Sequence, residues 1–348
     1  MPQTPNISEN LLSTHFILCT ERTGSSLLSL ILNLHPQILS PSEEPFALYF
    51  YKSYKHKVVW TDKELQDFIN EFWLIAEKSL ELFFTSKENL FNALSPYKNN
   101  LPYDKLVNII YQQFVEPKPK DKLSLIVDKQ IKYFFYLKEL IKLFPNSKFI
   151  ILVRDPRVNA QRKKLRNLNA GTSAIYLSAL WRNTYKNIYY LKKHERQIKI
   201  VKYEDLVANP ESTIKGLCEF MDVPYTHIML ETEGMYEKFL EIQKNKINKE
   251  HVDYLKDFHS GLFTKINTEK ISLKENEIDE TVNNKIIHLC SDLLKEFKYD
   301  INSTGNGKLN VNDYLQILKA YLYRPLLIRM YLHIPLGIKL VIKKIRKP

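Results

Sequence analysis

The sequence predicts an α/β fold in which helices cover both faces of a central parallel sheet, in three layers. Short apolar runs typical of buried strands alternate along the chain with longer segments of helical periodicity. Four of these runs end in charged or polar residues, and 348 residues suffice for one large domain with added helices. Because parallel strands share one carboxyl edge, we expect a single cleft to collect these polar groups.

The first predicted strand, His15–Cys19, leads into the loop Arg22-Thr-Gly-Ser-Ser26, and an apolar helical pattern follows at once. Gly24 allows a close backbone approach, and the start of the helix offers N–H groups and the positive end of its dipole. Arg22 and the hydroxyls of Ser25 and Ser26 add donors, so the loop predicts a site for a phosphate-like anion. The Walker lysine and its Mg²⁺-binding hydroxyl are absent, which argues against Mg-ATP. An ordinary tight turn remains the alternative.

Three later strands also end in polar groups. Residues 123–129 end in Lys129 and lead into a predicted helix over 131–143. Residues 148–154 end in Arg154 and lead into a basic helix on which Arg162 and Arg166 share a face. The fourth strand, which begins at Ile198, ends at Tyr203-Glu-Asp205. The loop at Arg22 and the strand end at Arg154 each carry an arginine, so together they can hold two phosphates of one ligand. A solvent-exposed helix face also explains Arg162 and Arg166.

Together these segments resemble the sulfotransferases that use 3′-phosphoadenosine-5′-phosphosulfate (PAPS). Arg22-Thr-Gly-Ser-Ser26 resembles their 5′-phosphosulfate loop, and Val153-Arg-Asp-Pro-Arg157 resembles their 3′-phosphate strand and helix. Lys202-Tyr-Glu-Asp-Leu206 and Phe220-Met-Asp-Val-Pro224 resemble a later segment of the family. Order and spacing match over roughly residues 14–275. The resemblance implies a P-loop-like fold, PAPS as co-substrate and no metal, and no metal-ligand spacing is found among the nine histidines.

The pattern is most similar to the bacterial enzymes and the tyrosylprotein sulfotransferases, because His35-Pro36 is followed by Ser42-Glu-Glu-Pro45. In the tyrosylprotein enzymes the second glutamate is the general base, which implies Glu44 here, with Glu43 as the rival. This chain has one extra residue between the two pairs. Either acid also suits the first turn of a helix that begins near Phe46. The phenol and steroid enzymes use a histidine shortly after the third-strand lysine, but no histidine follows Lys129 closely.

The resemblance also implies the residues that hold the donor. Arg22 and Lys129 would stabilise charge on the leaving phosphate and the sulfonate. The 5′-phosphate would meet the rest of the loop, namely Thr23, Gly24, Ser25 and Ser26, and the 3′-phosphate would meet Arg154 and Arg166.

Three further positions are less regular. Arg162 stands where relatives have a serine, so it either replaces that serine as a phosphate donor or points away. Tyr203 matches a residue that lies against the nucleotide in the tyrosylprotein enzymes, and the alternative is a core aromatic. Lys265 falls near a late lysine that relatives place over the donor, with the register off by about one residue.

We divide the chain into a sulfotransferase domain over 1–310, with a helical insertion at about 61–115, and a basic, apolar helical tail over 311–348. Other helices are expected near residues 170–194, 211–221, 237–258 and 280–297. The three cysteines are widely spaced and two lie in apolar patterns, which indicates buried thiols and no disulfide framework.

The tail carries most of the excess charge. Residues 314–348 contain eight Lys or Arg and no Asp or Glu, and the rest of the chain has 43 basic and 39 acidic residues. Near its end, the longest stretch without Lys or Arg is Met330–Ile338, which is far short of the ~20 residues that span a bilayer. We expect Pro325 and Pro335 to divide the tail. The pattern suits a helix lying on an anionic membrane surface, and a helix packed on the enzyme is the alternative.

The first fourteen residues lack the pattern of a signal peptide, so we expect a cytoplasmic protein, peripheral at the inner membrane face if the tail binds lipid. No nucleic-acid motif accompanies the positive charge. The predicted reaction is sulfuryl transfer from PAPS to a hydroxyl of a carbohydrate, glycolipid, phenol or peptide tyrosine. Two alternatives stay open: a nucleotide or small-molecule kinase, and a non-catalytic anion- or lipid-binding protein on the same fold.

Overall fold

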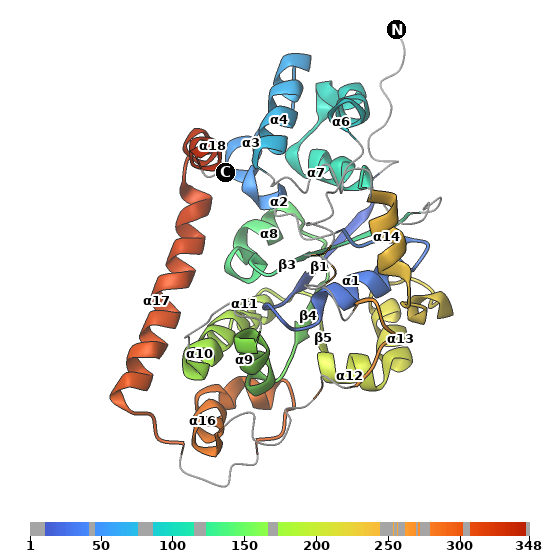
Figure 1. Ribbon diagram of the computed structural model, residues 1–348. Helices are drawn as coiled ribbons and strands as arrows, with labels where there is room; N and C mark the ends of the chain where they lie inside the picture. Colours follow the sequence, from blue (N-terminus) through green and yellow to red (C-terminus); the bar gives the residue numbers. More distant parts are fainter. Residues whose placement is uncertain are drawn as a thin grey trace.

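The computed structural model describes residues 11–41, 46–75, 86–114, 123–165, 173–243, 253, 256, 262–268, 271, 279–301 and 307–345. Five strands form one parallel sheet in the order β2-β3-β1-β4-β5 (Figure 1). The strands are β1 (Ser13–Leu18), β2 (Ile38–Leu39), β3 (Leu125–Gln130), β4 (Phe149–Val153) and β5 (Ile198–Lys202). The predicted α/β fold is therefore confirmed. The sequence pattern missed β2, because two residues are too few for a strand periodicity.

The strand order places a switch point beside β1. From β1 the chain runs to β2 and β3 on one side of the sheet, and it then returns to β4 and β5 on the other side. The crevice between β1 and β4 therefore opens at the carboxyl edge, which is where open α/β sheets bind ligands. The loop after β1 and Arg154 after β4 both lie at this edge.

Helices cover both faces of the sheet, because successive strand residues point to opposite sides. On one face Ile17 and Ile150 pack with α1 (Ser25–Asn33), α12 (Tyr203–Ala208) and α13 (Pro210–Phe220). On the other face Phe16 and Ile151 belong to a larger core with α7, α8, α10, α11 and α16. These five helices span Tyr103–Gln112, Leu137–Leu143, Ala174–Tyr185, Ile188–Lys193 and Glu280–Glu296.

The described part of the insertion is helical and extends the larger core. It contains α4 (Asp62–Ile75), α6 (Lys87–Leu94), the 3₁₀ segment Ser95–Asn100 and α7. Two short helices precede it, α2 (Phe46–Tyr49) and α3 (Tyr51–Tyr54). The buried ring of Phe50 joins these short helices to α4 through an edge contact with Phe68 and a tilted contact with Phe72. The insertion contacts the sheet through α7, because the hydroxyl of Tyr111 bonds to Asp128 of β3 and Asn108 bonds to Thr14 of β1.

The remaining predicted helices are α9 (Pro156–Leu165) and α14 (Met235–Gln243), and residues 244–252 lie outside the described part of the chain. The single helix predicted over 131–143 is wrong. A 3₁₀ turn, Tyr133–Phe135, comes first, and α8 begins only at Leu137. Tyr136 between them has a non-helical backbone, φ −130° and ψ 25°, and its hydroxyl donates to the carbonyl of Ile328.

The tail forms α17 (Val311–His333) and α18 (Leu336–Ile345). Pro335 separates the two helices as predicted, but α17 runs through Pro325 without a break, so that prediction is wrong. A proline inside a helix costs about 3 kcal/mol. Packing on α10 and a capping box at Asn310 and Asp313 stabilise the helix against this penalty. Within the described residues, no helix combines the length and the apolar character needed to cross a membrane.

Candidate active site

The loop after β1 has two residues in the left-handed region, Arg22 (φ 65°) and Gly24 (φ 85°). The hydroxyl of Thr23 donates to the carbonyl of Thr20 at 2.8 Å, which closes the turn from within. Gly24 is the N-cap of α1, and the first turn of this helix contains no acidic residue. A glycine has no side chain with which to cap the helix, so the first N–H groups of α1 remain available to an anion.

Tyr203, the first residue of α12, packs directly on this loop. A Cβ atom added at Gly24 would lie 2.3 Å from Cδ2 of the Tyr203 ring, which explains why only glycine fits there. The guanidinium of Arg154 covers the same ring, with its Cζ 4.2 Å from the ring centroid. Stacking of a guanidinium on an aromatic face is favourable. Residues from the ends of β1, β4 and β5 therefore meet in one contact.

Three guanidinium groups surround this contact. Arg154 donates from Nη1 to the carbonyl of Arg22 at 3.2 Å, which steadies the left-handed turn. Burial lowers the pKa of Arg154, and the charges of Arg162 and Arg22 lower that pKa further. Burial raises the pKa of Tyr203, while the charges of the same three arginines oppose that shift. The charge of Arg162 therefore lies close enough to act on both Arg154 and Tyr203, and its buried Nε has no hydrogen-bond partner among the described residues.

Two α9 residues that sequence reasoning missed hold the loop from the other side. Asn159 donates from Nδ2 to the carbonyl of Glu21 at 2.8 Å. Lys163, whose side chain is 1% exposed, pairs with the carboxylate of Glu21 at 3.1 Å. Asn159 and Lys163 are four residues apart on one helix face, and this spacing was the available signal.

Glu204 connects β4 to the end of α16 and was also missed. It accepts a hydrogen bond from the backbone N–H of Asp155 at 3.1 Å and another from the hydroxyl of Tyr299 at 2.8 Å. Burial raises the pKa of the Glu204 carboxyl. Because Asp155 follows Arg154 and Glu204 follows Tyr203, these bonds fix the spacing between the two stacked side chains.

At the end of β3, two neighbouring charges point to opposite faces. Asp128 faces the larger core and accepts hydrogen bonds from the hydroxyls of Tyr111 and Tyr133. Burial raises the pKa of Asp128 from 3.8 to about 6, against the effect of these two bonds. Lys129, 5% exposed, points to the face that α1 covers, as Val127 does. Its ammonium group therefore lies on the side of the sheet that carries the phosphate loop's helix.

The segment after β2 is the one that contains the proposed base, Glu44. It leaves the sheet at the carboxyl edge, where the phosphate loop also lies. Ser40 donates from Oγ to the carbonyl of Val127 at 2.9 Å and exchanges two bonds with Asn33. Glu43 and Glu44 lie outside the described residues, as does Arg166 of the predicted 3′-phosphate site. Their roles stay predictions.

His35 of the His-Pro pair has a structural function. Its Nδ1 accepts from the N–H of Gln37 at 3.1 Å, and its Nε2 lies 2.7 Å from the carbonyl of Pro224. The proton must therefore reside on Nε2. This bond joins the His35-Pro36 segment to the segment that ends at Pro224, and the two are far apart in the sequence.

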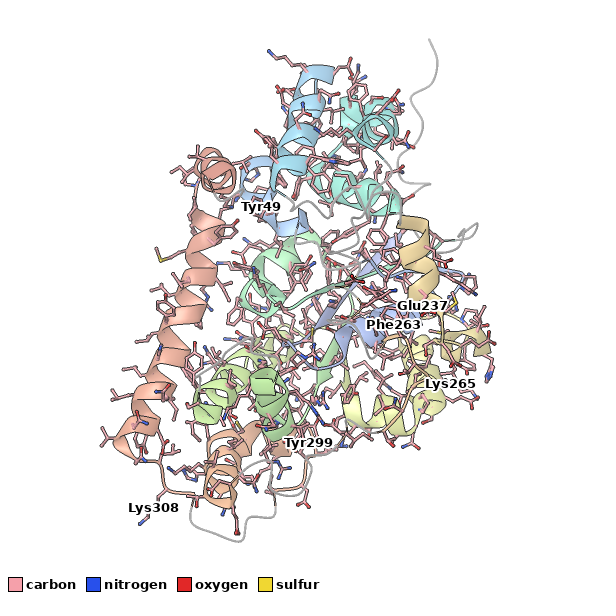
Figure 2. All side chains as sticks on the ribbon, viewed as in Figure 1. Tyr49, Glu237, Phe263, Lys265, Tyr299 and Lys308 are labelled. Carbon is pink, nitrogen blue, oxygen red and sulfur yellow. The ribbon has the colours of Figure 1, made fainter. Side chains whose placement is uncertain are left out.

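Lys265 is 81% exposed and pairs with Glu233 at 3.5 Å. Figure 2 shows it on the side of the molecule opposite α17. Its contact with a donor stays a prediction.

A small cavity adjoins the phosphate loop on the side of α9 and α10. It contains polar groups from the end of β1 and from α9, together with apolar side chains. The lining residues are Thr20, Glu21, Ile131, Lys132, Phe135, Lys163, Leu180, Thr184 and Ile328. Thr20 and Glu21 of this lining directly precede Arg22, so the cavity adjoins the start of the phosphate loop.

Comparison with known proteins agrees with this geometry. The sequence model of the sulfotransferase family matches residues 15–227. That range contains the phosphate loop with Arg22, the end of β4 with Arg154, and the segment around Tyr203. The chain belongs to the sulfotransferase family.

Relatives and solved structures agree with this assignment. A protein-tyrosine sulfotransferase of Drosophila melanogaster is 24% identical over 251 residues, which are 67% of this chain and 43% of that protein. Protein-tyrosine sulfotransferase 1 of Danio rerio is 29% identical over 119 residues, 32% of this chain and 33% of that protein. The chain thus matches less than half the length of these relatives. The sulfotransferase domain of the Synechococcus PCC 7002 olefin synthase shares the fold, with a TM-score of 0.52 and 20% identity over 83% of this chain and 96% of that one.

The residues present fit the PAPS that this family uses. An uncapped helix N-terminus and three converging guanidinium groups provide donors for phosphate oxygens. Like charges held together in a partly buried site are stabilised when an anion neutralises them. Over the described part of the chain, no three His, Cys, Asp or Glu residues are placed to hold a metal ion.

We expect Gly24→Ala to lower the unfolding free energy by about 2–4 kcal/mol, because the new Cβ combines left-handed strain with a clash against Tyr203. In a Tyr203→Ala background the same change should have a smaller effect, since only the strain remains. Urea unfolding of the two single variants and the double variant measures this coupling. Gly337→Ala is the control, because a Cβ there meets nothing within 4 Å. An equal loss with and without the Tyr203 ring would contradict the proposed contact.

Asp128 predicts a pH dependence of stability. Its pKa is raised to about 6 in the folded state, so the folded protein holds this proton more tightly than the unfolded chain. The associated stability is complete below pH ~4 and is lost as the pH rises through ~6, on the order of 3 kcal/mol in total. Urea unfolding of wild type and Asp128→Asn at several pH values should show this difference. Parallel pH profiles for the two proteins would show that Asp128 ionises normally.

Proposed function

We propose that this protein transfers the sulfuryl group of PAPS to an acceptor hydroxyl. The observation that carries the proposal is the convergence of Arg22, Arg154 and Arg162 around the Tyr203 ring, at the start of an uncapped helix. This arrangement suits a ligand with two separated phosphate groups, of which PAPS is an example. The family match over residues 15–227 supports the same donor.

In the proposed reaction the acceptor oxygen attacks sulfur as the bond from sulfur to the 5′-phosphate oxygen breaks. Adenosine 3′,5′-bisphosphate leaves, and the acceptor becomes a sulfate ester. Negative charge grows on the leaving phosphate, so we assign Arg22 and Lys129 to stabilise it. Thr23, Gly24, Ser25 and Ser26 hold the 5′-phosphate, and Arg154 with Arg162 and Arg166 holds the 3′-phosphate.

Glu44 is the proposed general base that takes the acceptor proton. Support comes from the start of its segment, since Ser40 is bonded to Val127, two residues before Lys129. The segment therefore departs from the sheet edge that carries Arg22 and Lys129. Glu43 is the neighbouring rival.

The proposed acceptor carries a hydroxyl group, as in a carbohydrate, a glycolipid, a phenol or a peptide tyrosine. The cavity beside the loop has room for about one water molecule, so we do not assign it to the acceptor. The protein-tyrosine sulfotransferases among the relatives are consistent with such acceptors.

Thermal unfolding with adenosine 3′,5′-bisphosphate tests the donor site. At a hundred times its Kd the ligand should add about 2.7 kcal/mol of stability, whereas AMP should add much less. Stabilisation by ATP with Mg²⁺ in place of the bisphosphate would indicate a kinase. No stabilisation by either would favour a binding protein without this activity.

We expect Glu44→Gln to lower kcat by about 10²–10⁴ and to leave the affinity for adenosine 3′,5′-bisphosphate unchanged. Glu43→Gln is the matched control and should keep a kcat near that of the wild type. Release of the bisphosphate from PAPS with a phenolic acceptor measures both rates. The opposite pattern would assign the base to Glu43, and normal rates in both variants would exclude a glutamate base at this pair.

A further inference from the structure

An apolar stripe runs along the outside of α17. Its members recur every three or four residues, so they share one face of the helix. They are Val311, Leu315, Leu318, Leu322, Leu326 and Met330, and each is between 54% and 78% exposed. Tyr314, Tyr323 and Leu327 flank this outer stripe and are also exposed. A helix of 23 residues is about 35 Å long, so the stripe is a large continuous apolar surface.

Contacts on the opposite side of α17 prevent the stripe from turning inward. Ala320 is fully buried against α10, and the hydroxyl of Tyr321 bonds to Arg182. Farther along the helix, Tyr136 donates to the carbonyl of Ile328. Figure 1 shows α17 along one edge of the molecule with α10 and α16 on its inner side. The outer stripe is therefore a fixed surface feature.

The end of the tail is anchored on Tyr49 of α2. Tyr331 and Tyr49 share a hydrogen bond of 2.9 Å between their hydroxyls, and Figure 2 places Tyr49 next to the upper part of α17. Lys339 of α18 is buried, and its Nζ lies 4.6 Å from the centroid of the Tyr49 ring. The exposed Ile338 and Val341 of α18 extend the apolar surface beyond the stripe. Both helices thus keep a defined position relative to the domain.

The charge of the tail identifies the kind of partner. Residues 314–348 contain eight Lys or Arg and no acidic residue. Lys339 is buried, whereas Lys319 and Arg329 of α17 are exposed. Two copies of this segment repel each other, whereas the surface of an anionic bilayer attracts it and accepts apolar side chains at the boundary of its acyl chains. We propose that the outer stripe of α17 docks in the interface of a membrane that contains anionic lipid.

Docking through the outer stripe would place α17 between the membrane and the cavity beside the phosphate loop, because Ile328 on the inner side of the same helix lines that cavity. The docking does not rest on the proposed function.

Liposome flotation of the full-length protein tests the docking separately from sulfuryl transfer. Vesicles of phosphatidylglycerol and phosphatidylcholine are compared with vesicles of phosphatidylcholine alone, at low and high salt. The wild type should float with the anionic vesicles, and high salt should weaken its partitioning. Leu322→Glu and Leu326→Glu should each lower the partition coefficient about 10- to 100-fold. Val59→Glu is the matched control, because Val59 is a 60% exposed apolar residue outside the tail, and it should float like the wild type.

Thermal midpoints of all four proteins check that the variants are folded. We expect little change in the midpoints of the two tail variants, because both leucines are more than half exposed. Equal flotation of wild type and tail variants would overturn the proposal. Formation of a dimer that Leu322→Glu abolishes, without flotation by the wild type, would assign the stripe to a second copy and also overturn it. Failure of the bisphosphate to stabilise the protein would leave the flotation result unaffected, so the two proposals can fail independently.

Discussion

The contact between the ring of Tyr203 and the backbone at Gly24 determines the geometry of the phosphate loop. It requires a residue without Cβ, and it is held by the Arg154 guanidinium on the ring and by that side chain's bond to the carbonyl of Arg22. The loop after β1, the end of β4 and the start of α12 cannot move independently as a result. Glu204, bonded to the backbone of Asp155 and to Tyr299, fixes the same strand ends from behind.

Burial of charge is the second constraint on the site. Arg154 is almost fully buried near two other guanidinium groups, and Lys129 and Lys163 are buried as well. Burial and the neighbouring arginines lower the pKa of Arg154, and an anionic ligand that binds there relieves this repulsion. The fold provides this accumulation because parallel strands deliver their carboxyl ends to one edge. Catalytic stabilisation of a leaving phosphate uses the same preorganised charges.

The tail connects the two ends of the molecule. Its first helix, α17, packs on α10 and on the 3₁₀ segment Tyr133–Phe135, and its last helix reaches α4 and the Tyr49 ring. One side of α17 contributes to the core and to the cavity beside the loop, while its other side carries a continuous apolar stripe. A surface partner of the stripe would therefore be oriented relative to the site by rigid packing.

The sequence by itself determined the parallel α/β fold, four of the five strands and the sulfotransferase family, because strand periodicity, helix starts and the loop around Gly24 are local patterns. It also identified Arg22, Lys129, Arg154 and Tyr203 as residues of the strand ends. Which side chains meet is visible only in the folded chain: the Tyr203 ring on Gly24, the charge of Arg162 near Tyr203, and Asn159 and Lys163 on Glu21. The tertiary structure also decided that α17 continues through Pro325, since packing on α10 outweighs the local preference of proline. Contacts between segments more than a hundred residues apart leave no periodic trace in the chain, and for that reason local pattern could not predict them.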